Sequence, residues 1–229
     1  MLDVKNVTKK YKTGKGIFDF TYTFEEGKVY ALVGPNGAGK TTLIKMLVGI
    51  SEFQKGYIQL DGISTKSREC KKSIGYALDF YPNEYNRNTI LQFLSMYCEI
   101  KYHNNYREDI HNVLKDYELL DVANTAIEDC SLGMKKKVGL IASFIGNPQL
   151  IVLDEPTNGI DTTGLITLKN KIIEAKQRNS IVIVSSHILD FVDAVSDEVL
   201  FLKKGRMIHG ELGNTEKQYR ELFMENSHC

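Results

Sequence analysis

One short segment constrains the fold of this chain more than any other: residues 34–41 match the pattern GxxxxGK[ST]. It follows an unbroken apolar run at residues 29–33, typical of a strand buried on both faces, and precedes a helical pattern at residues 42–48. Glycines let such a loop fold back, so that successive N–H groups point at phosphate oxygens and the helix offers its positive end. We therefore predict a phosphate-binding loop, with Lys40 at the β- and γ-phosphates and the Thr41 hydroxyl on Mg²⁺. The residues expected to hold phosphate are Gly34, Pro35, Asn36, Gly37, Ala38, Gly39, Lys40, Thr41 and Thr42.

Further apolar runs predict the sheet that carries this loop. Residues 150–153 and 181–184 are also unbroken, and the helical stretch at about 164–178 separates them, which indicates a parallel α/β sheet. Near the start, aromatic residues alternate with polar ones over residues 18–24, and together with residues 2–7 this predicts an antiparallel sheet. Residues 199–202 and 207–209 predict a hairpin, followed by a polar terminal helix.

Residues 85–145 show a different pattern, in which apolar residues follow helical spacing and not the alternation typical of strands. We predict that they form a helical lobe inserted within a single domain of 229 residues. Thr89 and Gln92 form a capping-box pattern at its start. One helix face is then predicted to carry Ile90, Leu91, Leu94, Tyr97 and Cys98.

Two consecutive carboxylates, Asp154 and Glu155, end the buried run at residues 150–153. A carboxylate at this point can hold Mg²⁺ through water, and its neighbour, turned the other way, can polarise an attacking water. We therefore predict that Asp154 serves the metal and that Glu155 is catalytic. Phosphoryl transfer needs positioning and charge neutralisation more than covalent chemistry.

At this point the sequence resembles the ATP-binding cassette (ABC) ATPase family, and the resemblance spans nearly the whole chain. Residues 154–161 are similar to its Walker B segment running into its D-loop, which places Asp161 among the nucleotide-binding residues. The resemblance identifies His187, after a buried strand, as the switch histidine expected at the γ-phosphate. It identifies Tyr11 as the aromatic residue that stacks on adenine. The fold that it implies is a P-loop NTPase core with a RecA-like parallel sheet, an N-terminal antiparallel β subdomain and the helical lobe.

The family signature LSGGQ is present in degenerate form at residues 130–134, where Ser131 and Gly133 keep their places. In the family this segment starts a helix that meets the γ-phosphate held by another subunit. The resemblance therefore implies a head-to-tail dimer, of two copies or of paired cassettes, with ATP at each interface. The following lysines at residues 135–137 fit a solvated helix face and a position near phosphate equally well.

The sequence departs from the family more clearly at the Q-loop than at the signature segment. Residues 74–79 are similar to the entry of its Q-loop, but Asp79 stands where the family has glutamine. Aspartate can bind Mg²⁺, although its side chain is shorter and charged, so we list Asp79 as a metal-binding candidate with altered coupling to a partner.

Composition narrows the setting. With 29 basic and 29 acidic residues the net charge is zero, which argues against a nucleic-acid partner. The sequence shows no signal-peptide pattern and no apolar run of about 20 residues, so a membrane role requires a separate permease. We expect a transporter motor with ATP and Mg²⁺ as cofactors, at the inner face of the cell membrane in the cytoplasm, resembling bacterial exporters of drugs or peptides. Import is the less favoured direction, and a regulatory ATPase that moves no cargo is the alternative.

Overall fold

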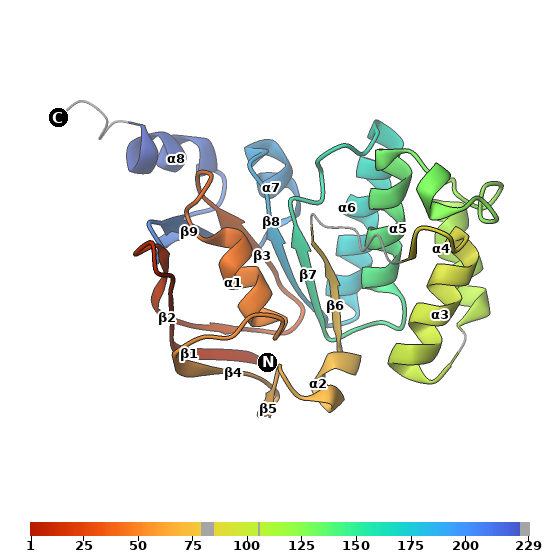
Figure 1. Ribbon diagram of the computed structural model, residues 1–229. Coiled ribbons are helices and arrows are strands. Elements are labelled where there is room, and N and C mark those ends of the chain that lie inside the picture. The colour runs from red at the N-terminus through yellow and green to blue at the C-terminus, as the bar shows by residue number, and fades with distance from the viewer. Residues whose placement is uncertain (79–84, 105, 225–229) are drawn as a thin grey trace.

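The computed structural model describes residues 1–78, 85–104 and 106–224, and these form two sheets with helices around them (Figure 1). The first sheet is antiparallel, in the order β2-β1-β4-β5. Its strands are β1 (Leu2–Lys10), β2 (Gly16–Phe24), β4 (Lys55–Leu60) and β5 (Ile63–Ser64). The predicted N-terminal antiparallel sheet is therefore confirmed.

The second sheet has the order β10-β9-β3-β8-β7-β6. Its strands β9, β3, β8, β7 and β6 pair in parallel, and β10 adds the predicted antiparallel hairpin at one edge. These strands are β3 (Val29–Val33), β6 (Ile74–Ala77), β7 (Leu150–Asp154), β8 (Ile181–Ser185), β9 (Glu198–Lys203) and β10 (Arg206–Gly210). Every residue of β3, β7 and β8 is buried, because both faces of this sheet are covered, as the unbroken apolar runs predicted.

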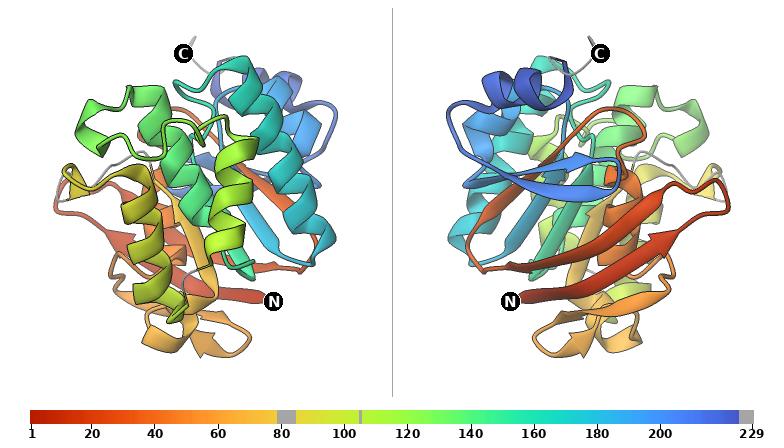
Figure 2. Two further views of the ribbon diagram at one scale, coloured as in Figure 1. Left: turned by 90° about the vertical axis from the view of Figure 1, so that its right-hand side faces the viewer. Right: turned by 90° about the vertical axis from the view of Figure 1, so that its left-hand side faces the viewer.

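Helices cover the two faces unequally (Figures 1 and 2). Helix α1 (Lys40–Leu47) packs between the two sheets, and the short α2 (Arg68–Lys72) precedes β6. The opposite face carries α3 (Ile90–Tyr102), α4 (Arg107–Asp116), α5 (Leu132–Phe144), α6 (Thr162–Gln177) and α7 (Leu189–Val195), with a 3₁₀ turn at Ile127–Asp129. The last helix is α8 (Thr215–Phe223). Alternate residues of β3 serve the two cores: Ala31 packs with these helices, and Leu32 packs with α1 and the antiparallel sheet.

Two details differ from the predicted patterns. In β2, Asp19 has a left-handed φ of 53° at a bulge, so Ile17 is buried before the bulge where the alternation predicted Phe18. In α3 the capping box of Thr89 and Gln92 is confirmed, and Ile90, Leu94 and Cys98 are buried. Leu91, however, is 40% exposed, because the buried face of this helix, which packs on α4 and α5, is narrower than predicted.

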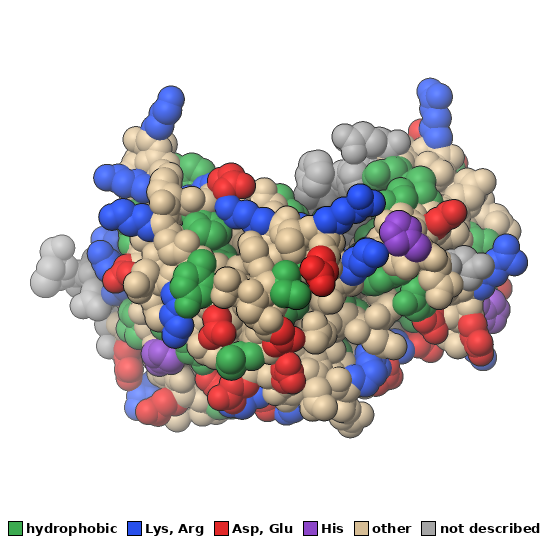
Figure 3. All heavy atoms as spheres, turned by 90° about the horizontal axis from the view of Figure 1, so that it is seen from below, with side chains coloured by type: hydrophobic (Ala, Val, Ile, Leu, Met, Phe, Trp, Pro, Cys, Tyr) green, Lys and Arg blue, Asp and Glu red, His purple; other side chains and the backbone are tan. Residues whose placement is uncertain are grey.

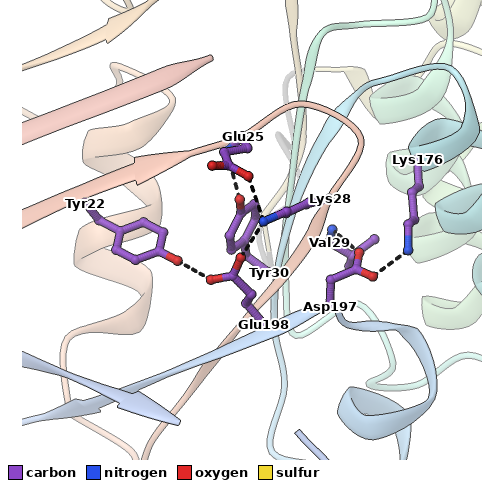
Figure 4. A network of polar contacts seen from close by, with 8 residues as sticks. All are labelled: Tyr22, Glu25, Lys28, Val29, Tyr30, Lys176, Asp197 and Glu198. Carbon is purple, nitrogen blue, oxygen red and sulfur yellow. Dashed lines mark hydrogen bonds and ion pairs between the residues drawn. The ribbon is translucent and has the colours of Figure 1, made fainter. Parts of the chain in front are cut away.

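A polar network joins the two sheets at the start of β9 (Figure 4). Glu198 accepts hydrogen bonds from the Tyr22 hydroxyl of β2 at 2.5 Å and from Lys28 Nζ at 2.9 Å. The adjacent Asp197 accepts from the backbone N–H of Val29 at 2.9 Å and from Lys176 Nζ of α6 at 2.5 Å. These contacts fix the antiparallel sheet against β3, the strand that leads into the phosphate-binding loop.

The face in Figure 3 shows basic and acidic side chains interspersed, in line with the zero net charge of the chain. Among the described residues, no helix is both long enough and apolar enough to cross a bilayer. The thiols of Cys70, Cys98 and Cys130 are free and buried.

Candidate nucleotide-binding site

The loop at residues 34–41 lies between the carboxyl end of β3 and the first turn of α1, as predicted. Gly39 precedes α1 with a left-handed φ of 114°, and a Cβ there would lie 2.7 Å from Ile17 Cδ1. A Cβ on Gly34 would lie 2.5 Å from the carbonyl oxygen of Leu202 in β9. The loop is therefore pressed against β2 and β9, and only glycine fits at these two positions.

The Lys40 ammonium lies inside this loop. Its Nζ donates a hydrogen bond to the carbonyl oxygen of Gly34 at 2.7 Å and lies 3.6 Å from Glu155 Oε1, and the side chain is only 8% exposed. One buried cation thus faces both the loop and the acidic end of β7, where a phosphate group would be held between them.

The two carboxylates at the end of β7 point to different partners. Ser185 Oγ of β8 donates to Asp154 Oδ1 at 2.6 Å and accepts from the backbone N–H of Glu155 at 2.9 Å. Glu155 has a left-handed φ of 48°, which turns its side chain away from that of Asp154. An unfavourable backbone conformation at such a site is kept by surrounding contacts, here those of Ser185.

His187 completes this end of the site. Its Nδ1 lies 2.8 Å from Glu155 Oε2, and its backbone N–H donates to the same oxygen at 3.3 Å. The Glu155 side chain is 16% exposed, whereas that of His187 is 60% exposed. Lys40 and His187 therefore hold the two oxygens of Glu155 from opposite sides, with the imidazole open to a ligand.

These groups line one cavity of ≈ 730 Å³. Of the predicted residues, it contains Tyr11, Gly34, Pro35, Asn36, Gly37, Gly39, Lys40, Thr41, Thr42, Asp154, Glu155 and His187. Ala38 is buried beneath the loop, where its N–H and carbonyl bond to Pro35 and Gly205. Tyr11 is 44% exposed at the cavity wall, which leaves its ring available for stacking.

Five lining residues were missed by the sequence analysis: Thr13, Lys15, Gly16, Asn158 and Tyr219. Thr13 and Lys15 belong to the connection between β1 and β2, and Gly16 is the first residue of β2. The polar composition of this segment carries no signal of a ligand. Asn158 lies within the segment at residues 154–161, where the prediction considered only the carboxylate side chains. Tyr219 comes from α8, far along the chain, so only folding brings it to the cavity.

Ser131, Gly133 and Asp161 form a second cluster that does not line this cavity. Ser131 Oγ caps α5 by accepting from the N–H of Met134 at 3.2 Å, and a Cβ on Gly133 would lie 3.0 Å from the Gly159 carbonyl oxygen. Asp161 caps α6 by accepting from the N–H of Gly164 at 2.8 Å. Within one chain, these three residues therefore lie outside the cavity that the phosphate-binding loop lines.

The lysine run behaves in two ways. Lys137 is buried, with 8% of its side chain exposed, and its Nζ pairs with Asp161 Oδ2 at 2.9 Å. Lys137 is therefore not part of a solvated helix face. This hydrogen bond lowers the pKa of Asp161. Lys135 is half-buried and donates to the carbonyl oxygen of Glu128 at 3.2 Å.

A magnesium ion fits the donors that the cavity offers. Mg²⁺ keeps several waters and binds through one or two carboxylates plus phosphate oxygens. Thr41 and Asp154 line the same cavity and supply one hydroxyl and one carboxylate. Among the described residues, no group of three or more His, Cys, Asp or Glu side chains is placed to hold a metal alone. Asp79, the third metal candidate, lies outside the described residues.

The fold and this cavity define a nucleotide-binding cassette of the P-loop class. The family model for "ABC transporter" matches residues 17–158. The chain is 33% identical over 214 residues to the uncharacterized ABC transporter ATP-binding protein YhcH of Bacillus subtilis, covering 91% of this chain and 68% of the relative. It is 32% identical over 227 residues to the lantibiotic transport ATP-binding protein SrtF of Streptococcus pyogenes, covering 97% and 96%.

A solved structure of the ATP-binding subunit of an ABC transporter superposes with a TM-score of 0.87 at 26% identity, covering 96% of this chain and 93% of that one. The chain belongs to the ABC transporter family, as one of its ATP-binding subunits.

Proposed function

We propose that this cassette binds ATP with Mg²⁺ in the cavity around Lys40 and hydrolyses it to ADP and phosphate. The single observation that carries this proposal is the position of Glu155, whose carboxylate lies between Lys40 and His187 at the wall of that cavity. The loop N–H groups and Lys40 bind the phosphates, and Tyr11 supplies a ring face for adenine. Thr41 and Asp154 would hold Mg²⁺, which neutralises charge on the β- and γ-phosphates when bound.

Hydrolysis then follows from the arrangement of the acidic end of β7. Glu155 orients a water for attack on the γ-phosphorus, the bond to ADP breaks, and the water proton leaves towards the carboxylate or the phosphate product. His187, with its exposed ring beside Glu155, contacts the γ-phosphate and keeps the carboxylate in place. Lys40 neutralises the charge that develops on the phosphoryl oxygens.

We further propose that two cassettes enclose the nucleotide. Ser131 and Gly133 lie at the start of α5, outside the cavity of their own chain, and a helix N-terminus is suited to bind phosphate. A second copy or a paired cassette would present this helix end to the ATP held around Lys40. ATP would then favour the closed dimer, and hydrolysis would reopen it.

The work of this cycle is export through a separate membrane permease, with the cassette at the cytoplasmic face of the membrane. The similarity to SrtF, a lantibiotic transport protein, supports a peptide-like cargo. Residues 85–145 would act as the inserted lobe that passes movement to the permease. Import remains the less favoured direction.

The test of the motor is Glu155→Gln, which keeps the shape of the side chain and removes its charge. We expect hydrolysis to fall by roughly 100-fold or more while Mg²⁺-dependent ATP binding persists and an ATP-held dimer accumulates in gel filtration. The matched control is Glu174→Gln, on the far part of α6. Unchanged turnover in Glu155→Gln would reject the assigned role of Glu155.

A regulatory ATPase without cargo is the second candidate, since the same site would serve it. A permease that co-purifies from detergent extracts would support transport, and stimulation of hydrolysis by that permease would confirm it. A soluble partner that co-purifies and responds to nucleotide would favour regulation.

A further inference from the structure

The C-terminal helix α8 brings a tyrosine to the nucleotide cavity. Tyr219 lines the same cavity as Lys40 and His187, although 179 and 32 positions separate it from these residues in the sequence. Figure 1 shows α8 beside α7 and above the loop that leads into α1. No motif of the chain pointed to this residue.

Specific contacts hold α8 in this place. At its start, the fully buried Thr215 donates from Oγ1 to Asp193 Oδ1 of α7 at 2.5 Å. At its end, Lys203 Nζ of β9 donates to the carbonyl oxygen of Leu222 at 2.5 Å. Phe223 packs on Phe201 of β9, with ring centroids 6.1 Å apart. Helix α8 is thus a docked part of the domain, and the position of Tyr219 is defined at both ends of its helix.

The Tyr219 side chain combines an anchored ring with an available hydroxyl. Its ring packs on Phe223 with centroids 4.8 Å apart, and the residue is half-buried. Among the described residues, its hydroxyl has no hydrogen-bond partner. The hydroxyl is not one of the buried side-chain polar atoms without a partner, so it is open to the cavity, and a ligand there can replace water as its hydrogen-bond partner.

The neighbours of α8 indicate which part of a bound nucleotide the Tyr219 hydroxyl would contact. Lys203, which holds α8, lies two residues before Gly205, whose N–H donates to the carbonyl oxygen of Ala38 at 2.9 Å. Leu202 of the same strand packs against the loop at Gly34. Helix α8 is therefore held by the strand that packs on the phosphate-binding loop. In the cavity that this loop lines together with Tyr219, the acceptors of a bound ligand include phosphate oxygens.

We propose that the Tyr219 hydroxyl donates a hydrogen bond to the phosphate chain of the bound nucleotide. Tyr219 is then a further binding residue, and nucleotide binding stabilises the docked position of α8. This inference rests on the proposed function, because it requires a triphosphate in the cavity. It assigns to the C-terminal helix a role in ligand binding beyond packing.

The test is Tyr219→Phe, which removes only the hydroxyl and keeps the ring on Phe223. Calorimetric titration measures two probes, a non-hydrolysable ATP analogue with Mg²⁺ and inorganic tripolyphosphate, which has no base. We expect both affinities to fall by roughly tenfold, as for loss of a hydrogen bond to a charged group. We also expect the melting temperature without nucleotide to stay unchanged and the shift caused by the analogue to shrink.

The matched control is Tyr57→Phe, a tyrosine that is 47% exposed and does not line this cavity. Unchanged affinity of Tyr219→Phe for both probes would overturn the inference, and so would weaker binding of the analogue alone, since the contact would then be with adenosine. If the wild-type protein itself binds neither probe, the proposed function fails, which is a distinct result.

Discussion

Lys137 of α5 pairs with Asp161, the residue that caps α6, through an Nζ to Oδ2 contact of 2.9 Å in which the lysine is buried. This pair ties the helix that starts at Ser131 to the segment that follows Glu155. Gly133 and Gly159 approach closely at the same junction. In the proposed dimer, the start of α5 would contact the ATP of the other cassette, and the segment after Glu155 would lie near the ATP of its own cassette. The Lys137–Asp161 pair therefore connects the two ATP sites through a single chain.

The first prediction concerns the pH dependence of this pair. The hydrogen bond from Lys137 lowers the pKa of Asp161, so the folded state favours the charged carboxylate. A depressed pKa adds stability that is present above the unfolded pKa of about 3.9 and is lost as the pH falls through the folded value. Asp161→Asn keeps the capping oxygen and removes the charge. We expect it to be less stable than the wild type at pH 7, with a difference that shrinks below about pH 4.

Denaturant unfolding at several pH values measures this difference. The control is Asp116→Asn, whose carboxylate also pairs with a lysine, Lys171, away from the nucleotide cavity. A gap between wild type and Asp161→Asn that stays constant from pH 7 to pH 3 would show that the charge pair adds no stability.

The second prediction concerns Ser185, which bonds both to Asp154 and to the N–H of Glu155. Ser185→Ala leaves these buried groups without that partner, which costs about 1–3 kcal/mol of unfolding free energy. It also removes the shorter of two hydrogen bonds to the Glu155 N–H, while the bond to the Ser185 carbonyl oxygen at 3.2 Å stays. The backbone that turns Glu155 towards His187 is then held less firmly, so we expect turnover to fall about tenfold at saturating ATP. Phosphate release assays measure the turnover.

Ser143→Ala is the matched control for this variant. Ser143 is equally buried, and its hydroxyl donates to the carbonyl oxygen of Leu140 at 2.7 Å in α5, outside the cavity. We expect it to lose stability with turnover retained. Equal turnover in both serine variants would exclude a positioning role for Ser185.

The third prediction concerns Gly39→Ala. Its φ of 114° is unfavourable for alanine, and the new Cβ would lie 2.7 Å from Ile17 Cδ1, so the loop or the buried Ile17 side chain must shift. We expect ATP binding, measured by calorimetry, to be lost, together with about 1–3 kcal/mol of unfolding free energy.

Gly213→Ala serves as its control, because Gly213 also has a positive φ, 77°, but no heavy atom lies within 4 Å of the new Cβ. Its stability should fall by about 1 kcal/mol with ATP affinity intact. ATP binding by Gly39→Ala at wild-type affinity would contradict the assigned geometry of the loop.

The sequence by itself determined β1 and β2 of the first sheet, the central strands and the hairpin of the second, the loop at residues 34–41 and the carboxylates at the end of β7, whereas β4 and β5 were not predicted. These features are local: strands buried on both faces appear as unbroken apolar runs, and a phosphate-binding loop needs glycines at fixed spacing between a strand and a helix. The capping box at Thr89 is local in the same way. For His187 and Tyr11, the family resemblance led to the cavity where the structure places them.

Only the tertiary structure decided which distant groups meet. The bulge at Asp19 buries Ile17, because strand register depends on pairing with β1 and not on alternation alone. The pairing of Lys137 with Asp161 and the arrival of Tyr219 at the cavity depend on how α5, α6 and α8 pack, and no periodic pattern encodes such contacts. Spacing along the chain reports what one element is, whereas packing between elements settles which side chains share a site.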